Sequence, residues 1–257
     1  MGRVEPLKIA AMLAACAVLF ATVAASAGGA TVRVGKLVLR ADGGFAPRML
    51  PRREYAPIRF QGHADIKTTD GSPPPALQRI RLDFDRDGRL TTAGLPVCQP
   101  AQLAGATPQQ ARSRCAGALV GTGHVKATIG VPGLRVNVTA PLSLFNGPGL
   151  SGNRTVIAHS QTIFPLPETY VVTIPVERRR GVYGYRSTFD LPPIAGGFGA
   201  LTHIDAKIGR RYRAGGAERS YISARCSDGI LQTLGLATFA DGTVISGSLF
   251  KGCQALP

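Results

Sequence analysis

Short stretches in which apolar and polar residues alternate recur along most of the chain. Alternation with a period of two places successive side chains on opposite faces of a strand, and these stretches are rich in residues that favour strands. Asp-Gly and Asn-Gly dipeptides, which suit tight hairpin turns, separate many of them. The predicted strands are 32–40, 57–68, 79–85, 118–131, 134–144, 155–164, 169–178, 183–191, 200–210, 219–225, 230–239 and 243–250.

This pattern predicts an all-β fold in which antiparallel strands form a two-sheet sandwich or a jelly-roll-like arrangement. Residues 28–257 are expected to form a single domain, and the basic stretch 40–53 is expected to be a loop. The Gly-rich stretch 146–153 leaves a second arrangement open, with two smaller β domains on either side of it.

One short helix is predicted near residues 108–115, where the strand pattern is interrupted. Thr107 has the side chain of an N-cap residue, Pro108 occupies the first helical position and Gln110 the third. This order of residues is typical of a capping box and therefore predicts where the helix begins.

The first 27 residues have the pattern of an export signal. A short basic region with Arg3 and Lys8 precedes the apolar stretch 9–25, and Ala25-Ser26-Ala27 provides the small residues that signal peptidase requires. Cleavage after Ala27 would release a secreted or outer-envelope protein. Two alternatives remain open: a membrane anchor, and a lipoprotein modified at Cys16.

Four further cysteines are consistent with an oxidising compartment, where an even number of cysteines indicates disulfides. Three pairings are conceivable, and the local pairs Cys98–Cys115 and Cys226–Cys253 are preferred. The first pair would staple the predicted helix to the strand before it. A zinc site is the competing interpretation, but the chain contains no pair of cysteines separated by two residues.

The charge is strongly unbalanced. The 257 residues include 30 Lys and Arg against 15 Asp and Glu, which gives a formal net charge of +15, while a hydrophobic content of 44% excludes wholesale disorder. Such a surface suits an anionic cell-wall polymer or a membrane surface, whereas nucleic acid is not expected because no zinc finger or RNP-like motif occurs. Two arginine clusters are the candidate anion-binding residues: Arg178, Arg179 and Arg180, and Arg210, Arg211 and Arg213. The alternative is that these clusters are solvated ends of hairpins.

Two His-x-Asp pairs provide one candidate metal site. His63 and Asp65 share one face of a predicted strand, and His203 and Asp205 share the polar face of another. If these strands were neighbours, two imidazoles and two carboxylates could bind zinc or another divalent metal. The alternative is a set of scattered surface histidines, because the sequence does not reveal strand adjacency.

The stretch Asp83-x-Asp85-x-Asp87-Gly resembles the first half of a calcium-binding loop, in which alternate carboxylates converge on one cation. The glutamate expected at the twelfth position is absent, and flanking helices are not evident. The alternative is a hairpin in which Asp83 and Asp85 face solvent while the apolar residues between them face the core.

Catalysis has little support in the sequence, because neither a G-x-S-x-G elbow nor an H-E-x-x-H motif occurs and Glu is scarce. The sequence therefore favours a noncatalytic envelope-associated protein without a cofactor. The alternative is a secreted hydrolase or lyase, assisted by a divalent metal, that acts on an acidic polysaccharide or a phosphate ester.

Several motifs resemble uncharacterised secreted proteins of actinobacteria. They are GLPVC at 94–98 with its spacing to Cys115, ALVGTG at 118–123, FNG at 145–147 and ARCSDG at 224–229. The resemblance implies an exported bacterial protein and carries no activity or site residues with it.

Overall fold

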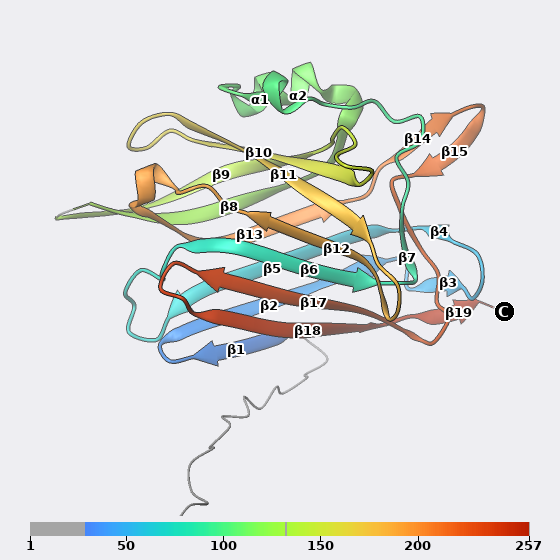
Figure 1. The fold of residues 1–257 in the computed structure, drawn as a ribbon, viewed down its shortest axis with the longest axis horizontal. Coiled ribbons are helices and arrows are strands. Elements are labelled where there is room, and N and C mark those ends of the chain that lie inside the picture. The colour runs from blue at the N-terminus through green and yellow to red at the C-terminus, as the bar shows by residue number, and fades with distance from the viewer. Residues whose placement is uncertain (1–28, 132, 257) are drawn as a thin grey trace, which may run out of the picture.

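The computed structural model describes residues 29–131 and 133–256, which form mainly β-strands (Figure 1). The predicted export signal 1–27, including Cys16, lies outside these residues. Within the described part of the chain, no helix is both long enough and apolar enough to cross a membrane.

Twelve antiparallel strands form the main sheet, in the hydrogen-bonded order β1-β2-β5-β13-β8-β9-β10-β11-β12-β6-β17-β18. Strands from both sides of residues 146–153 pair with each other in this one sheet, because β9 lies next to β10. The strands of the main sheet are β1 (Ala30–Val34), β2 (Leu37–Ala46), β5 (Arg59–Thr68), β6 (Leu77–Asp85), β8 (Leu119–Val131), β9 (Leu134–Asn146), β10 (Arg154–Thr162), β11 (Glu168–Arg178), β12 (Tyr183–Asp190), β13 (Gly199–Ile208), β17 (Ile230–Phe239) and β18 (Val244–Gly252).

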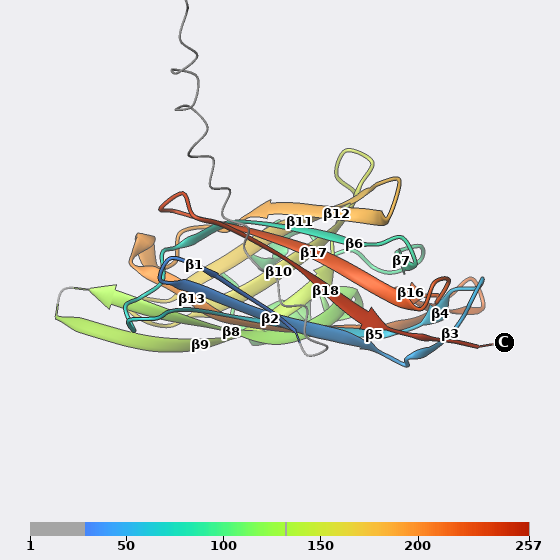
Figure 2. The ribbon, with the colours of Figure 1, turned by 90° about the horizontal axis from the view of Figure 1, so that it is seen from below.

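The sheet curls until its two edge strands, β1 and β18, approach each other, so that it is nearly closed into a barrel. Val32 of β1 and Ile245 of β18 are buried in the same hydrophobic cluster. Figure 2 shows the flattened cross-section, with β11, β12, β6 and β17 in one wall and β9, β8, β13 and β5 in the other. The prediction of a two-sheet sandwich or jelly roll is therefore wrong, although the all-β class is confirmed.

The error has a physical cause. Alternation shows that each strand has one buried face, but a strand has the same pattern whether it faces a second sheet or the inside of a curled one. Local shifts of register, which bend and twist strands, accompany the curvature here. One such shift lies between Leu201 and His203 in β13, and another between Leu119 and Gly121 in β8.

Shorter strands flank the main sheet. The stretch 32–40, predicted as one strand, is instead the hairpin β1–β2, with its turn at Gly35, whose φ is 56°. The stretch 40–53 was predicted as a loop, but β2 extends into it. The short strands are β3 (Met49–Pro51) beside β19 (Gln254–Leu256), β4 (Ala56–Pro57) and β7 (Gly88–Leu90) on either side of β16 (Ile222–Ala224), and β14 (Arg211–Ala214) beside β15 (Ala217–Ser220).

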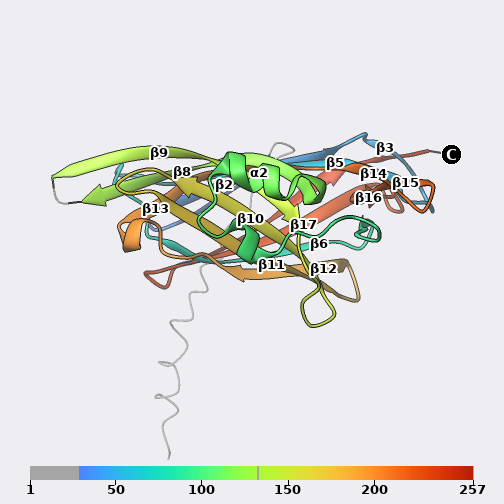
Figure 3. The same cartoon turned by 90° about the horizontal axis from the view of Figure 1, so that it is seen from above.

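The predicted helix is confirmed as α2 (Pro108–Arg114), with a capping box between Thr107 and Gln110. It covers β9 and β10 from outside the sheet, where Phe145 and Ile157 are buried, and α1 (Pro100–Leu103) packs beside it against β11 (Figure 3). Two 3₁₀ turns complete the described helical elements, η1 (Ala116–Ala118) and η2 (Ala195–Gly197).

Both predicted disulfides are confirmed. Cys98–Cys115 closes the segment that contains α1 and α2, and Cys226–Cys253 joins the segment after β16 to the segment after β18. Both bridges are buried or nearly buried in hydrophobic clusters, so they staple peripheral segments to the main sheet. Two disulfides are consistent with a protein that folds outside the cytoplasm.

Candidate functional site

The two His-x-Asp pairs lie next to each other on the outer face of the sheet, because β13 is hydrogen-bonded between β5 and β8. In this register His203 lies opposite Asp65, and Asp205 lies opposite both His63 and His124. Residues directly opposite each other in antiparallel strands point to the same face. The adjacency that the sequence left open is therefore present, and it includes a third histidine from β8.

The carboxylates and imidazoles form two dyads. His203 Nδ1 lies 2.7 Å from an Asp65 carboxylate oxygen, and His124 Nδ1 lies 3.4 Å from an Asp205 carboxylate oxygen. The His124 and His203 rings are stacked, with centroids 5.0 Å apart and an interplanar angle of 26°. A carboxylate at Nδ1 orients an imidazole and leaves its Nε2 edge for an external partner.

Glycine in β8 makes this close arrangement feasible. A Cβ placed on Gly123 would lie 1.9 Å from the Asp205 carbonyl oxygen, whereas real Cβ atoms do not approach within 3.0 Å. The absence of a side chain at Gly123 therefore lets β13 and β8 come together where His124 meets Asp205.

The dyads do not form a metal centre. Across residues 29–131 and 133–256, no group of three or more His, Cys, Asp or Glu side chains is arranged to hold a metal ion. Each carboxylate instead faces the Nδ1 atom of a single imidazole.

A basic depression continues the same face of the sheet beyond the dyads. Lys207 lies two residues after Asp205 in β13 and so points to the same side. With Arg59, Arg210 and Arg211 it lines a shallow depression of about 440 Å³. The Arg210 guanidinium is held in place because it donates to the carbonyl oxygens of Ala116 and Leu119, at 3.1 and 2.8 Å.

Two of these residues, Arg59 and Lys207, were absent from the predicted anion-binding set. The sequence pattern does place Lys207 on the same face as His203 and Asp205, because it continues their alternation along one strand. Arg59 likewise continues the alternation of His63 and Asp65 along β5, but its place beside Gly209 depends on the pairing of β5 with β13, which the sequence did not show.

The other predicted basic residues are partly engaged with neighbours. Arg178 donates to the Tyr185 hydroxyl at 3.5 Å and stacks on that ring, and Arg179 forms an ion pair with Glu177 at 3.0 Å. Arg180 is exposed in the turn after β11. Arg213, in β14, lies opposite Glu218 across the β14–β15 hairpin.

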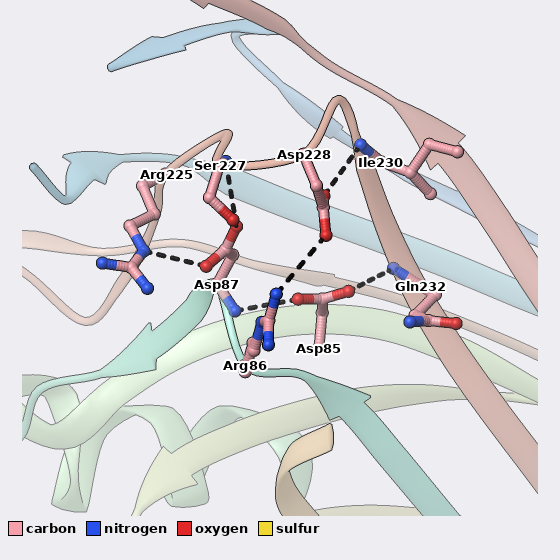
Figure 4. A network of polar contacts seen from close by, with 8 residues as sticks. All are labelled: Asp85, Arg86, Asp87, Arg225, Ser227, Asp228, Ile230 and Gln232. Carbon is pink, nitrogen blue, oxygen red and sulfur yellow. Dashed lines mark hydrogen bonds and ion pairs between the residues drawn. The ribbon is translucent and has the colours of Figure 1, made fainter. Parts of the chain in front are cut away.

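The Asp-x-Asp-x-Asp stretch is buried and clamps two loops together (Figure 4). Asp87, at the β6–β7 turn, accepts from Arg225 Nε at 2.8 Å, from Ser227 N at 3.0 Å and from the Ser227 hydroxyl. Asp85 accepts from the backbone N–H groups of Asp87 and Gln232 at 2.8 and 3.0 Å. These carboxylates hold the segment after β16 against the end of β6.

Asp83 lies on the face of β6 opposite the core, as the hairpin interpretation predicts, but it is only 1% exposed. Arg81 and Arg186 cover its carboxylate with ion pairs of 2.8 and 2.5 Å. Long arginine side chains can bury a neighbouring group while they keep their own ends in solvent. The three aspartates thus have separate partners and do not converge on one cation.

The fourth histidine, His159, is fully buried beneath the helical segment. Its Nε2 lies 2.9 Å from the Ala106 carbonyl oxygen, and burial is the main cause that lowers its pKa. His159 is therefore a structural residue that connects β10 to the segment between α1 and α2.

Comparison with known proteins adds no assignment: no protein-family description, curated protein or solved structure matches the chain.

Proposed function

We propose that the protein is an exported, noncatalytic β protein that binds an anionic polymer of the cell envelope through its basic depression. The observation that carries this proposal is the convergence of Arg59, Lys207, Arg210 and Arg211 around one concave surface. Fixed cations that surround a depression attract anionic groups more strongly than the same cations dispersed over a surface. The net charge of +15 adds long-range attraction.

Other features support the proposal. The pattern of residues 1–27 and the resemblance to secreted actinobacterial proteins both favour export. The two disulfides fit an oxidising compartment. Arg210 is already oriented by backbone carbonyl groups, so less side-chain freedom is lost when an anion binds.

A pair of charge reversals tests the proposal. The double variant R59E/R211E of the disulfide-intact protein is expected to bind isolated cell walls about tenfold more weakly at low salt, because it changes the sign of half of the cations around the depression. Co-sedimentation at low and high salt measures the effect, and high salt is expected to weaken wild-type binding because exposed charges are screened.

The matched control is R33E/R135E, which changes the net charge equally. Arg33 and Arg135 are exposed and lie about 30 Å along the strands from the depression. The control is expected to keep most of the binding. Equal losses in both variants would show that only total charge matters, and a wild-type protein that stays in solution at both salt concentrations would refute the proposal.

A second candidate function, a hydrolase or lyase acting on an acidic polysaccharide, is favoured by the His203–Asp65 dyad. A carboxylate that orients an imidazole is the usual arrangement of a general base. Incubation with polygalacturonate, followed by measurement of new reducing ends, tests it. Product from the wild type but not from H203N would favour the enzyme, and no product from either would remove this candidate.

A further inference from the structure

The two dyads and the basic depression belong to one continuous strip of the sheet. Along β13, His203, Asp205 and Lys207 point to the same side, so successive members are about 7 Å apart. On the neighbouring strand the same side carries Asp65, then His63, with Arg59 at the depression. A linear polymer that binds in the depression would therefore cross the stacked imidazoles if it continued along the strands.

The charge of this strip next to the stack depends on the histidines. With neutral imidazoles, Asp65 and Asp205 offset Arg40 and Lys126, which lie opposite Asp65 and His203. Strand β9 places the uncharged Pro141 opposite His124. Asp42, which is paired with Lys251 at 2.6 Å, lies opposite His63 on the same side, and Lys67 follows Asp65 there.

Histidine is the side chain that ordinarily changes its charge between about pH 5 and pH 8. Protonation of His124 and His203 would add two positive charges to this segment. The two protonated rings would repel each other at a centroid distance of 5.0 Å, and an anion at their outer edges would offset that repulsion. Anion binding and proton uptake at this pair therefore favour each other, as any two linked binding events do.

We propose that the stacked imidazoles of His124 and His203 are a proton-dependent anion site that extends the basic depression, so that a linear polymer bearing carboxylates or phosphates binds more tightly when they are protonated. This inference rests on the proposed function, because the depression supplies the binding that does not depend on pH. The side chains are 42% and 18% exposed, so both are accessible to a polymer on the surface.

Binding of two defined probes at constant ionic strength tests the inference. Polygalacturonate supplies carboxylates and polyphosphate supplies phosphates, and both remain anionic between about pH 5.5 and pH 7.5. The wild-type protein is expected to bind at least one of them about tenfold more tightly at the lower pH, because two charges are added close to the polymer. The probe with the larger change identifies the anionic group that the site prefers.

Three variants make the result specific. H124N/H203N is expected to bind with an affinity that changes less than about twofold over the same range, since asparagine does not titrate there. H63N is the matched control: His63 shares this side of the sheet but stands outside the stack, and its variant should keep the pH dependence. The single variant H124N replaces only the more exposed ring. It can be tested in place of the double variant if thermal unfolding shows that the double variant misfolds.

The outcomes separate this inference from the proposed function. Affinity that is equal at both pH values, while R59E/R211E still weakens binding, overturns the inference and leaves the proposed function in place. pH dependence that persists in H124N/H203N, or that disappears in H63N, also overturns it. Absence of salt-sensitive binding at either pH rejects the proposed function together with the inference.

Discussion

Replacement of Asp87 by alanine is expected to lower the free energy of unfolding by about 3 kcal/mol, because it removes one partner of a buried charge pair. Asp87 is 1% exposed and is bound by Arg225 and by two groups of Ser227. In the variant, the Ser227 N–H would lose its acceptor. The Arg225 guanidinium would lose this ion pair and keep its position over the Tyr55 ring, 5.2 Å from the ring centroid.

Urea unfolding under oxidising conditions measures this loss, with Asp190→Ala as the matched control. Asp190 forms an ion pair of 2.6 Å with Arg79, but the side chain of Asp190 is 66% exposed. Exposed ion pairs contribute little, so the control should unfold almost like the wild type. A loss that is as small for Asp87→Ala as for Asp190→Ala would show that the clamp between the loops is not important for stability.

The same carboxylate gives the fold a defined pH dependence. Burial alone would raise the pKa of Asp87, but Ser227 and Arg225 outweigh it and lower that pKa. The contribution of Asp87 is therefore fully present above its unfolded-state pKa of about 4 and is lost as pH falls through its folded-state pKa. Asp85 has the opposite effect on stability. Burial raises its pKa, so its ionised form opposes folding.

Substitution of alanine for Gly123 is expected to cost about 3 kcal/mol of stability and to disrupt the stacked histidine pair. The new Cβ would lie 1.9 Å from the Asp205 carbonyl oxygen and 2.9 Å from the Ala206 Cα. Because these obstacles are backbone atoms, no side-chain rotation relieves them, and β8 must move away from β13. His124 would then separate from Asp205.

Two measurements check this expectation, namely urea unfolding and the pH dependence of polyanion binding. Gly130→Ala is the matched control, because Gly130 lies in the same strand and a Cβ there would meet no atom within 4 Å. The control should unfold like the wild type and retain the pH dependence. If both variants behaved alike, the close approach at Gly123 would not determine how β8 and β13 pair.

Features that depend on residues close in sequence were predicted correctly. The capping box joins Thr107 to Gln110, three residues later, and Cys98 is only 17 residues from Cys115. The polar face that carries His203 and Asp205 could also be read, because alternation assigns faces. What alternation does not assign is the neighbour of each strand, so the sequence could not show that β13 lies between β5 and β8.

The burial of the aspartates was missed for a different reason. Asp83 occupies the face that alternation marks as polar, and that assignment is correct. Whether such a face meets water depends on side chains from other strands, here Arg186 in β12. Local pattern therefore indicates the direction of a side chain but not what covers it.

The strand order also affects when the candidate site can form as the chain folds. Asp65 and its partner His203 are separated by 138 residues, and β13 occupies the place between β5 and β8. During folding, β5 and β8 therefore lack this neighbour until a distant part of the chain joins them, and such distant pairings are typical of slow folding. The imidazole stack therefore depends on a long-range pairing, and a folding intermediate in which β13 has not joined β8 lacks it.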